Sequence, residues 1–462
     1  MAERVRVVKR GAKAAGAGRS VSAARRAAFE ILRRVEEEGA FAAPLLANPP
    51  GALSPEDRAL CYELVLGVLR RQLWLDRALE HFAGRNVGKL DAPVRLALRL
   101  GLFQLRFLTR VPAHAAVNES VNLAHAGGLR SAAPFVNAVL RRATRETDFD
   151  PAAGTTDELE RIAVKTSHPP WLIRRWAAGF GAEEAAKLAD ANNASAPASF
   201  RVNALKADAD AVVKDLREAG LSVAPSLVAP GGWRVEGGGG AAGVLRGLAS
   251  EGVVYMQDEA SQLVAHVLGA RPSERVLDAC AALGSKTTHV AALAGDRAQV
   301  VAGDLYEHRL RVVGEACARL GVGSVRAVAL NAEEALPFAD GAFDRVLVDA
   351  PCTGTGTLRH NPEIRWRLKP ENVRALPDVQ ARILSTAARV VRRGGRLVYS
   401  TCSVEREEDE GVVEAFLDSN PDFKQAEASP APAALLLPSG AARTWPHRDD
   451  VDGFFVAALE RQ

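Results

Sequence analysis

Two short polar segments, each directly after an apolar run, constrain this chain more than any other feature. Asp-Ala-Pro-Cys at residues 349–352 follows the run 345–348, and Ser-Thr-Cys-Ser at residues 400–403 follows the run 396–399. Both runs have the length and composition of buried strands. Ligands bind beyond the carboxyl ends of the strands in open α/β sheets, so we expect an acid and two thiols to meet in one cleft. This combination is typical of nucleophilic catalysis by cysteine.

A glycine turn between a predicted strand and a predicted helix follows a third apolar run. Asp278 ends this strand, Gly284 lies in the turn, and a helical pattern begins at Lys286. Backbone amides in such a turn point toward a ligand. Asp304 ends the next strand, about 20 residues after Gly284, where an acid usually accepts hydrogen bonds from ribose hydroxyls. The spacing of a phosphate loop is missing. The glycine turn and the acid at this distance together predict a nucleotide-type cofactor, with a plain strand-to-helix turn as the alternative.

Periodicity divides the 462 residues into four parts. Residues 1–20 are basic without a hydrophobic core and are expected to be a disordered tail, with an organellar transit segment as the alternative. Residues 21–148 have helical spacing almost throughout, with helices predicted at 23–37, 94–108, 113–126 and 132–145. Residues 149–248 predict a small α+β subdomain with a glycine-rich loop at 230–243. From residue 249 strands and helices alternate, which predicts a doubly wound α/β domain. Its strands are predicted at 253–258, 275–279, 299–303, 324–329, 345–349, 396–400 and 454–459.

Charge is distributed unevenly along the chain. Residues 1–150 contain 24 Lys and Arg against 15 Asp and Glu, which leaves 35 against 41 in the remainder. This asymmetry predicts an acidic partner such as nucleic acid, although arginines on solvated helix faces are the alternative. The 5 cysteines are scattered and odd in number, which favours a reducing compartment over a disulfide framework. No apolar run reaches the roughly 18 residues of a membrane span, so we expect a cytoplasmic protein without a membrane partner.

The helical front resembles a NusB-like RNA-binding domain. The resemblance is carried by Cys-Tyr-Glu-Leu-Val-Leu-Gly-Val-Leu-Arg at residues 61–70, Val-Pro-Ala-His-Ala-Ala-Val-Asn-Glu at 111–119 and Phe-Val-Asn-Ala-Val-Leu-Arg at 135–141. It implies that this bundle binds RNA, whereas the pattern alone indicates only a basic helical domain.

The remainder resembles the RNA cytosine-5 methyltransferases. Asp-Ala-Cys-Ala-Ala-Leu-Gly-Ser-Lys-Thr-Thr-His at residues 278–289 is similar to their S-adenosylmethionine loop, and residues 349–356 and 400–403 resemble their other two signatures. Together with the front, the likeness is closest to the RsmB/Sun (Fmu) family, which methylates 16S ribosomal RNA. It implies a multidomain protein with an all-α NusB-like N-terminal bundle, a small α+β linker subdomain and a C-terminal α/β Rossmann-like class I methyltransferase domain. The implied partner is small-subunit ribosomal RNA, and a monomer without a metal is expected. The alternatives are a transfer-RNA cytosine-5 methyltransferase and a non-catalytic RNA-binding or ribosome-assembly factor.

This resemblance also implies the site residues. Cys402 is the expected nucleophile, Asp349 the acid or hydrogen-bond partner at N3 of cytosine, Cys352 the residue that assists release, and Lys286 a residue that orients the base. Burial as small hydrophobes is the alternative for both cysteines. The residues expected to bind S-adenosylmethionine are Cys280, Ala281, Ala282, Leu283, Gly284, Ser285, Lys286, Asp304, Asn331 and Asp349.

Two departures from the family pattern affect the expected cofactor site. Leu283-Gly284-Ser285 stands where the family usually has Pro-Gly-Gly, so Ser285 is expected to crowd the cofactor unless its φ is negative. Asn331 stands where many relatives have an aspartate. Beyond the second signature, a basic and aromatic segment is expected either to contact RNA or to be solvated, namely Arg359, His360, Arg365, Trp366 and Arg367.

Overall fold

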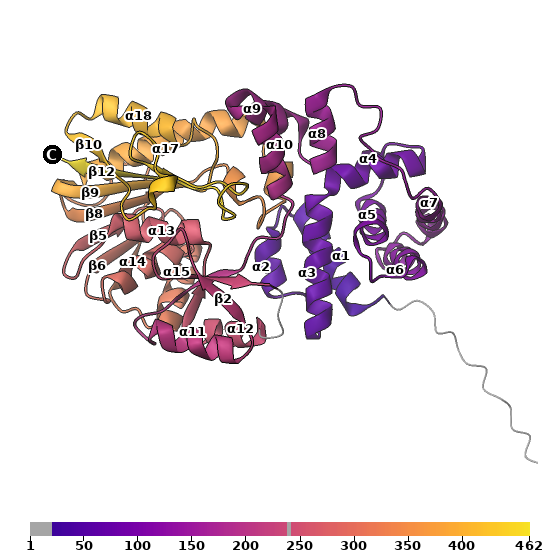
Figure 1. The fold of residues 1–462 in the computed structure, drawn as a ribbon, viewed down its shortest axis with the longest axis horizontal. Coiled ribbons are helices and arrows are strands. Elements are labelled where there is room, and N and C mark those ends of the chain that lie inside the picture. The colour runs from indigo at the N-terminus through magenta and orange to yellow at the C-terminus, as the bar shows by residue number, and fades with distance from the viewer. Residues whose placement is uncertain (1–20, 238–241) are drawn as a thin grey trace, which may run out of the picture. The chain divides into compact units, whose positions relative to one another are not determined.

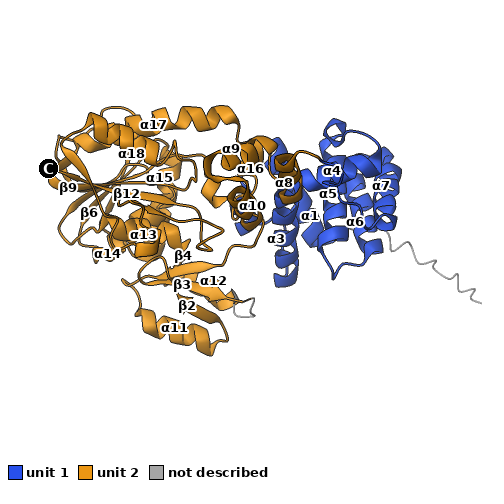
Figure 2. Ribbon diagram, turned by 45° about the horizontal axis from the view of Figure 1, so that its top comes forward, with its two compact units in different colours: residues 1–155 blue, residues 156–462 orange. Residues whose placement is uncertain are grey.

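A computed structural model describes residues 21–237 and 242–462, and the chain forms two compact units, residues 1–155 and 156–462 (Figure 2). The segment 1–20, predicted to be a disordered tail, lies outside the described residues. No helix of the described part is long and apolar enough to cross a membrane.

The first unit is a bundle of α-helices around a continuous apolar core, as the helical spacing predicts. Ser54 caps its third helix by accepting a hydrogen bond from Asp57 N at 3.1 Å, with Pro55 as the first helical residue. Ser22 precedes the first helix, but its hydroxyl accepts from Arg25 instead of capping the backbone. The helices are α1 (Ala23–Glu37), α2 (Ala42–Ala47), α3 (Pro55–Arg70), α4 (Gln72–Ala83), α5 (Ala92–Phe107), α6 (Ala113–Ala126) and α7 (Ala133–Arg145), with short 3-10 turns η1 (Val87–Lys89) and η2 (Arg130–Ala132).

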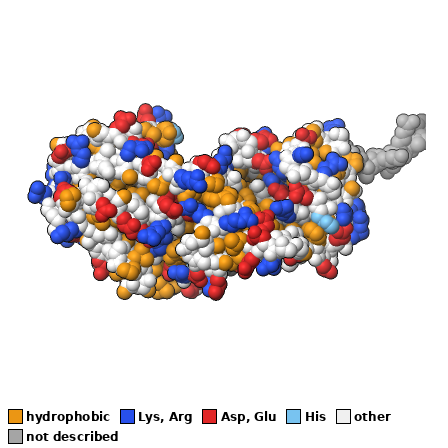
Figure 3. Space-filling model, turned by 90° about the horizontal axis from the view of Figure 1, so that it is seen from above, with side chains coloured by type: hydrophobic (Ala, Val, Ile, Leu, Met, Phe, Trp, Pro, Cys, Tyr) orange, Lys and Arg blue, Asp and Glu red, His pale blue; other side chains and the backbone are white. Residues whose placement is uncertain are grey.

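Most of the basic excess near the N-terminus comes from residues outside the described part. Residues 1–20 hold 6 Lys and Arg and 1 acid, so residues 21–150 keep 18 basic against 14 acidic residues. Several of these arginines pair with acids in the same unit, for example Arg99 with Glu36 and Asp76 at 2.7 Å. Side chains of both signs are interspersed on the face drawn in Figure 3. The distribution of charge therefore does not identify an RNA-binding surface on this face.

The second unit begins with helices and a small mixed α/β layer. The helices α8 (Glu158–Thr166), α9 (Pro170–Phe180) and α10 (Ala182–Ala191) pack around the buried Trp176. An antiparallel sheet of order β2-β3-β1-β4 follows. Its elements are β1 (Ser199–Val202), α11 (Ala209–Glu218), β2 (Ser222–Pro225), β3 (Gly232–Glu236), α12 (Ala242–Ser250) and β4 (Val254–Met256).

Two sequence predictions about this layer are wrong. The glycine-rich stretch 230–243 is not a loop throughout, because β3 lies within it and pairs with both β1 and β2. The predicted strand 253–258 does not begin the large sheet, because β4 pairs with β1 in the small sheet. In both cases the backbone of a distant segment supplies the hydrogen bonds, which no local pattern reveals.

The large sheet has the order β10-β12-β9-β8-β5-β6-β7, with β11 also paired to β12. Helices α13, α14 and α15 cover one face and α17 and α18 the other, so the domain has three layers (Figure 1). The predicted Rossmann-like fold is confirmed, and β10, β11 and α18 are elements of it that the sequence patterns did not predict. The elements are α13 (Glu259–Leu268), β5 (Arg275–Asp278), α14 (Ser285–Leu293), β6 (Gln299–Asp304), α15 (Glu307–Leu320), β7 (Val325–Ala329), β8 (Phe343–Asp349), η3 (Thr355–Thr357), α16 (Ile364–Arg367), α17 (Pro370–Arg389), β9 (Val391–Thr401), α18 (Glu410–Ser419), β10 (Phe423–Ala426), η4 (Ala433–Leu435), β11 (Ala442–Arg443) and β12 (Phe455–Arg461).

Candidate active site

The carboxyl ends of parallel strands form the candidate site. β6 and β7 lie on one side of β5 and β8 and β9 on the other, so the strand order reverses between β5 and β8. Open α/β sheets bind their ligands at this reversal. Asp278 ends β5, Asp304 ends β6, Asp349 ends β8, and Cys402 follows β9. Residues far apart in sequence therefore reach one edge of the sheet.

The two thiols lie side by side at this edge, as the sequence predicts. Cys352 Sγ is 3.4 Å from Cys402 Sγ, and both residues are half-buried. The parallel pairing places Asp349 opposite Ser400, so the two segments leave the sheet together. The hydrogen bond with Cys402 and burial raise the pKa of the Cys352 thiol well above its ordinary value. Cys352 therefore keeps its proton at neutral pH.

Lys286 forms a shielded ion pair beside the thiols. Its Nζ lies 2.7 Å from Asp349 Oδ2, and Ser400 Oγ donates to Asp349 Oδ1 at 2.8 Å. The Phe454 ring centre lies 5.1 Å from the same Nζ. Burial lowers the pKa of Lys286, but the charge of Asp349 and its hydrogen bond outweigh burial and raise that pKa. Lys286 therefore remains a cation at neutral pH.

The predicted cofactor loop has the backbone geometry of a ligand-binding turn. Gly284 precedes α14 with a φ of 90°, in the left-handed region that favours glycine. A Cβ at Gly284 would meet Val313 Cα at 3.2 Å. Ser285 is the first residue of α14 and has the negative φ of a helical residue. The expected crowding at Ser285 therefore does not arise from its backbone.

A cavity of about 450 Å³ opens at the same edge of the sheet. This volume is within the range of small-molecule sites. Of the residues expected to bind the cofactor, its wall includes Cys280, Ala282, Asp304, Asn331 and Asp349. The structure does not place five others on this wall, namely Ala281, Leu283, Gly284, Ser285 and Lys286. Both Cys352 and Cys402 lie on the wall, so the thiols and the cofactor residues share one cavity.

The chemistry of the wall fits S-adenosylmethionine. Asp304 is buried, and its Oδ1 accepts a hydrogen bond from Tyr306 N at 3.0 Å, which fixes the carboxylate toward ribose hydroxyls. Arg309 Nη1 lies 3.5 Å from Asp304 Oδ2. Asn331 holds its own turn, because its Oδ1 accepts from the amide of Glu333 at 3.1 Å. Alanine, leucine, valine and isoleucine side chains supply much of the remaining wall and suit an adenine ring.

Sequence reasoning missed several wall residues. They are Leu305, Tyr306, Arg309, Leu330, Leu376, Val379 and Ile383. The spacing of Leu376, Val379 and Ile383 on α17 is that of one helix face, so a stripe of helical periodicity was the available signal. The others follow the ends of β6 and β7, where loop residues commonly contact ligands.

Two residues of the segment after Cys352 differ from both sequence expectations. Arg359 and Arg365 are buried, so they are neither solvated nor exposed to RNA phosphates. Arg359 donates to Asp450 Oδ1 at 2.8 Å, and Arg365 donates to the carbonyl of Asn192 at 3.1 Å. These two arginines hold the segment in place, and this role required tertiary contacts that the sequence does not reveal. In residues 21–237 and 242–462 no group of His, Cys, Asp and Glu is arranged to hold a metal ion.

Three family models match the chain. They are "16S rRNA methyltransferase RsmB/F" over residues 265–460, the NusB family over residues 22–145, and the RsmF/B-like ferredoxin-like domain over residues 168–240.

Whole-chain relatives agree with these matches. A probable ribosomal RNA small subunit methyltransferase B of Bacillus subtilis (strain 168) is 34% identical, over 94% of this chain and 98% of that protein. The protein of the same name from Synechocystis sp. is 37% identical, over 95% and 99%. The crystal structure of PH0851 is similar with a TM-score of 0.81 and 28% identity, over 95% of this chain and 98% of that one.

Proposed function

Because this chain belongs to the RsmB/F family of 16S rRNA methyltransferases, we propose that it methylates carbon 5 of a cytosine in small-subunit ribosomal RNA. The observation that carries the proposal is the pair of thiols, 3.4 Å apart, on the wall of a cavity that also contains Asp304 and Asp349. Amino and hydroxyl groups are nucleophilic without help, whereas cytosine C5 is not. A nucleophilic cysteine is therefore the group that distinguishes methylation at carbon from methylation at nitrogen or oxygen.

We assign the nucleophile to Cys402. Its thiolate forms a bond to carbon 6 of the base, and the electrons of the C5–C6 double bond make C5 nucleophilic. S-adenosylmethionine, when bound, supplies the electrophilic methyl group. Lys286 is assigned to orient the base through its ion pair with Asp349, whereas Cys352 keeps its proton and is not assigned as the nucleophile.

Asp349 is assigned to the base edge at N3. The ion pair with Lys286 and the hydroxyl of Ser400 orient its carboxylate, and it lies on the cavity wall. A carboxylate in this place can accept a hydrogen bond from the amino group of cytosine, and the protonated carboxyl group can donate one to N3. The target base must leave its stack to reach this position.

We assign to Cys352 the role of assisting the release of the methylated product. The proton at C5 passes to a base, its bonding electrons restore the ring double bond, and Cys402 leaves carbon 6 as a thiolate. Cys352 Sγ lies 3.4 Å from the sulfur that must leave and keeps a proton that it can donate in a hydrogen bond to the departing thiolate, which supports this assignment.

Methyl transfer to unmethylated 16S ribosomal RNA tests the proposal. We expect Cys402→Ala to abolish transfer and Cys352→Ala to accumulate a covalent RNA–protein complex that survives denaturation. Cys317→Ala is the matched control, because Cys317 is a buried residue of α15 that does not line the cavity. Full turnover by Cys402→Ala would contradict the proposed chemistry.

The target is identified by bisulfite sequencing of RNA from a deletion strain. Loss of one 5-methylcytosine in 16S ribosomal RNA is the expected result, and loss in transfer RNA alone would contradict the assigned substrate. A non-catalytic role requires that the cofactor site be lost. The left-handed Gly284, the helical Ser285 and the buried Asp304 argue against such loss.

A further inference from the structure

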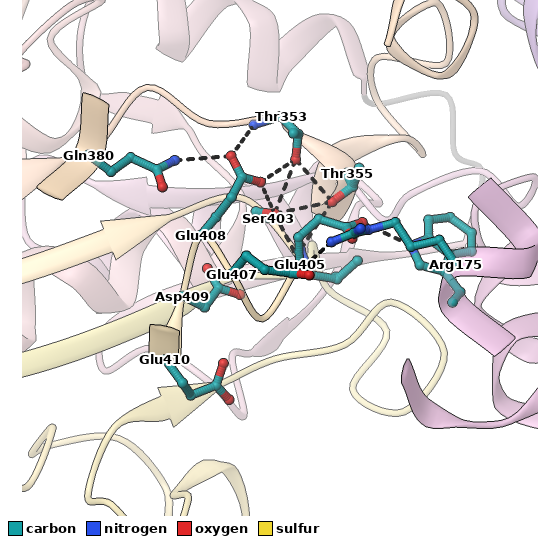
Figure 4. A network of polar contacts seen from close by, with 12 residues as sticks. Arg175, Thr353, Thr355, Gln380, Ser403, Glu405, Glu407, Glu408, Asp409 and Glu410 are labelled. Atoms are coloured by element: carbon teal, nitrogen blue, oxygen red, sulfur yellow. Dashed lines mark hydrogen bonds and ion pairs between the residues drawn. The ribbon is translucent and has the colours of Figure 1, made fainter. Parts of the chain in front are cut away.

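One buried carboxylate, Glu408, contacts the segments that carry both cysteines (Figure 4). Glu408 lies between β9 and α18 and is fully buried. Its Oε1 accepts from Thr353 N at 2.9 Å, and its Oε2 accepts from the hydroxyls of Thr353 and Ser403. Thr353 directly follows Cys352, and Ser403 directly follows Cys402. The same carboxylate therefore holds the residue next to each thiol.

The fourth donor to Glu408 comes from the helix that lines the cavity. Gln380 Nε2 on α17 donates to Glu408 Oε1 at 3.0 Å and to the carbonyl of Pro351 at 2.9 Å. Tyr399 OH on β9 donates to the backbone carbonyl of Glu408 at 2.6 Å and so also holds the loop between β9 and α18. A carboxylate has about four acceptor positions, and the four donors fill them.

Glu408 has no contact with the cavity, so it does not touch substrate or cofactor there. Among the described residues, its side-chain partners are Thr353, Ser403 and Gln380 alone. Burying a carboxylate is unfavourable unless its hydrogen bonds are satisfied. The loss of any one of these contacts should therefore shift the positions of the remaining partners.

We infer that Glu408 is a positioning residue that fixes the separation of the Cys352 and Cys402 sulfur atoms. This inference rests on the proposed function, because it concerns the two thiols to which that function assigns the chemistry. Displacement of reacting groups by about 1 Å can lower a rate by about 100-fold. Glu408 contacts the segments that carry both cysteines. Its loss should therefore lower the rate of the catalytic steps that use both sulfurs more than it lowers the affinity for the cofactor.

Glu405 provides a matched control in the same loop. Its side chain is also buried, but its partners lie on α9, because it accepts from Trp176 Nε1 at 3.0 Å and pairs with Arg175 (Figure 4). Glu405→Gln and Glu408→Gln thus make the same substitution at two buried positions of one loop. Only Glu408→Gln places an amide donor against the donors that join the two cysteine segments.

The readout is the rate at which Cys352 and Cys402 form a disulfide. Oxidised glutathione takes two electrons from the two thiols and leaves as two molecules of glutathione, and mass spectrometry of the digest identifies the Cys352–Cys402 bond. The sulfurs must approach from 3.4 Å to about 2.05 Å, so the rate reports their relative position. It does not depend on RNA or on methyl transfer.

We expect Glu408→Gln to slow disulfide formation and to lower kcat about 10-fold or more, with the KM for S-adenosylmethionine unchanged. Glu405→Gln should leave both rates within about twofold of the unmodified chain. Equal disulfide rates in the two variants would overturn the inference and leave the proposed function intact. If the unmodified chain fails to methylate C5 while the disulfide rates still differ, the proposed function fails and the positioning role stands.

If Glu408→Gln does not fold, a second variant tests the same inference. Ser403→Ala removes one of the four donors and keeps the carboxylate, so we expect a smaller decrease of disulfide formation, about threefold. An unchanged rate in Ser403→Ala would overturn the inference.

Discussion

The buried carboxyl group of Asp278 makes the stability of this protein depend on pH in a way that can be measured. Burial and the nearby charge of Asp349 together raise the pKa of Asp278 from 3.8 to about 7, although the hydrogen bond from Thr287 opposes this rise. Thr287 Oγ1 donates to Asp278 Oδ2 at 2.7 Å, whereas Oδ1 meets no donor within the described part of the chain. The folded protein therefore favours the protonated acid.

The sign and size of the effect follow from proton linkage. Below pH 3.8 the Asp278 carboxyl group is protonated in the folded and unfolded chain alike. Between pH 3.8 and about 7 the unfolded chain loses this proton and the folded chain keeps it, so the free energy of unfolding falls as pH rises. One pKa unit is worth about 1.4 kcal/mol, so the whole shift of about 3 units is worth about 4 kcal/mol. Between pH 5 and 8 the loss is about 3 kcal/mol.

Asp278→Asn removes this titration and keeps the shape of the side chain. We expect the free energy of unfolding of the variant, minus that of the unmodified chain, to rise by about 3 kcal/mol from pH 5 to pH 8. Any constant effect of the amide cancels in this comparison. Thr287→Val is the control, because it keeps the carboxyl group and should lose stability with pH at least as steeply as the unmodified chain.

Urea unfolding followed by tryptophan fluorescence measures the relevant unit. Of the 6 tryptophans only Trp74 lies in the first unit, so the signal reports mainly the unit that contains Asp278. A difference between Asp278→Asn and the unmodified chain that stays constant from pH 5 to 8 would refute the reasoning, because Asp278 would then be ionised in the folded state already at pH 5.

Three further changes test the candidate site. Gly284→Ala should lower the free energy of unfolding by about 1–3 kcal/mol and weaken cofactor binding in calorimetric titration, because alanine is strained at a φ of 90° and its Cβ meets Val313. Ser285→Gly should leave cofactor affinity within about twofold in the same titration, because Ser285 already has helical φ, and a large gain would restore the crowding hypothesis. Lys286→Met should lower the free energy of unfolding by about 1–3 kcal/mol in urea, less than for a fully buried pair because the Asp349 side chain is 26% exposed. The same variant should lower the yield of covalent RNA complex in a Cys352→Ala background, and an undiminished yield would contradict its proposed role.

The convergence of the two thiols was predictable because parallel strands end at the same edge of a sheet. Apolar runs at 345–348 and 396–399 and the polar residues after them were sufficient to place Cys352 and Cys402 together. The contact of their sulfurs depends on the register that pairs Asp349 with Ser400, and register is set by hydrogen bonds between segments, which the sequence does not display.

Glu408 was not predictable for a related reason. It lies in the acidic run Glu405-Arg406-Glu407-Glu408-Asp409-Glu410, which is typical of a solvated loop or the start of a helix. Its burial depends on donors from residues 353, 380 and 403, which come from three separate segments. The placement of β4 in the small sheet has the same cause, since only its partner β1 decides which sheet it joins.

The acidic residues of this site show why residue type and position do not determine chemical role. Asp278, Asp304 and Asp349 each end a parallel strand, and among them the sequence spacing singled out only Asp304. Burial with one hydroxyl donor favours a neutral acid at Asp278, whereas an ammonium at 2.7 Å gives Asp349 a fixed ionic partner. Asp304 is held at the cavity wall by a backbone amide and by the more distant Arg309, and it can accept hydrogen bonds from hydroxyl groups. Each role follows from the donors that surround the carboxyl group, so exchanging those donors should exchange the roles while the strand ends stay in place.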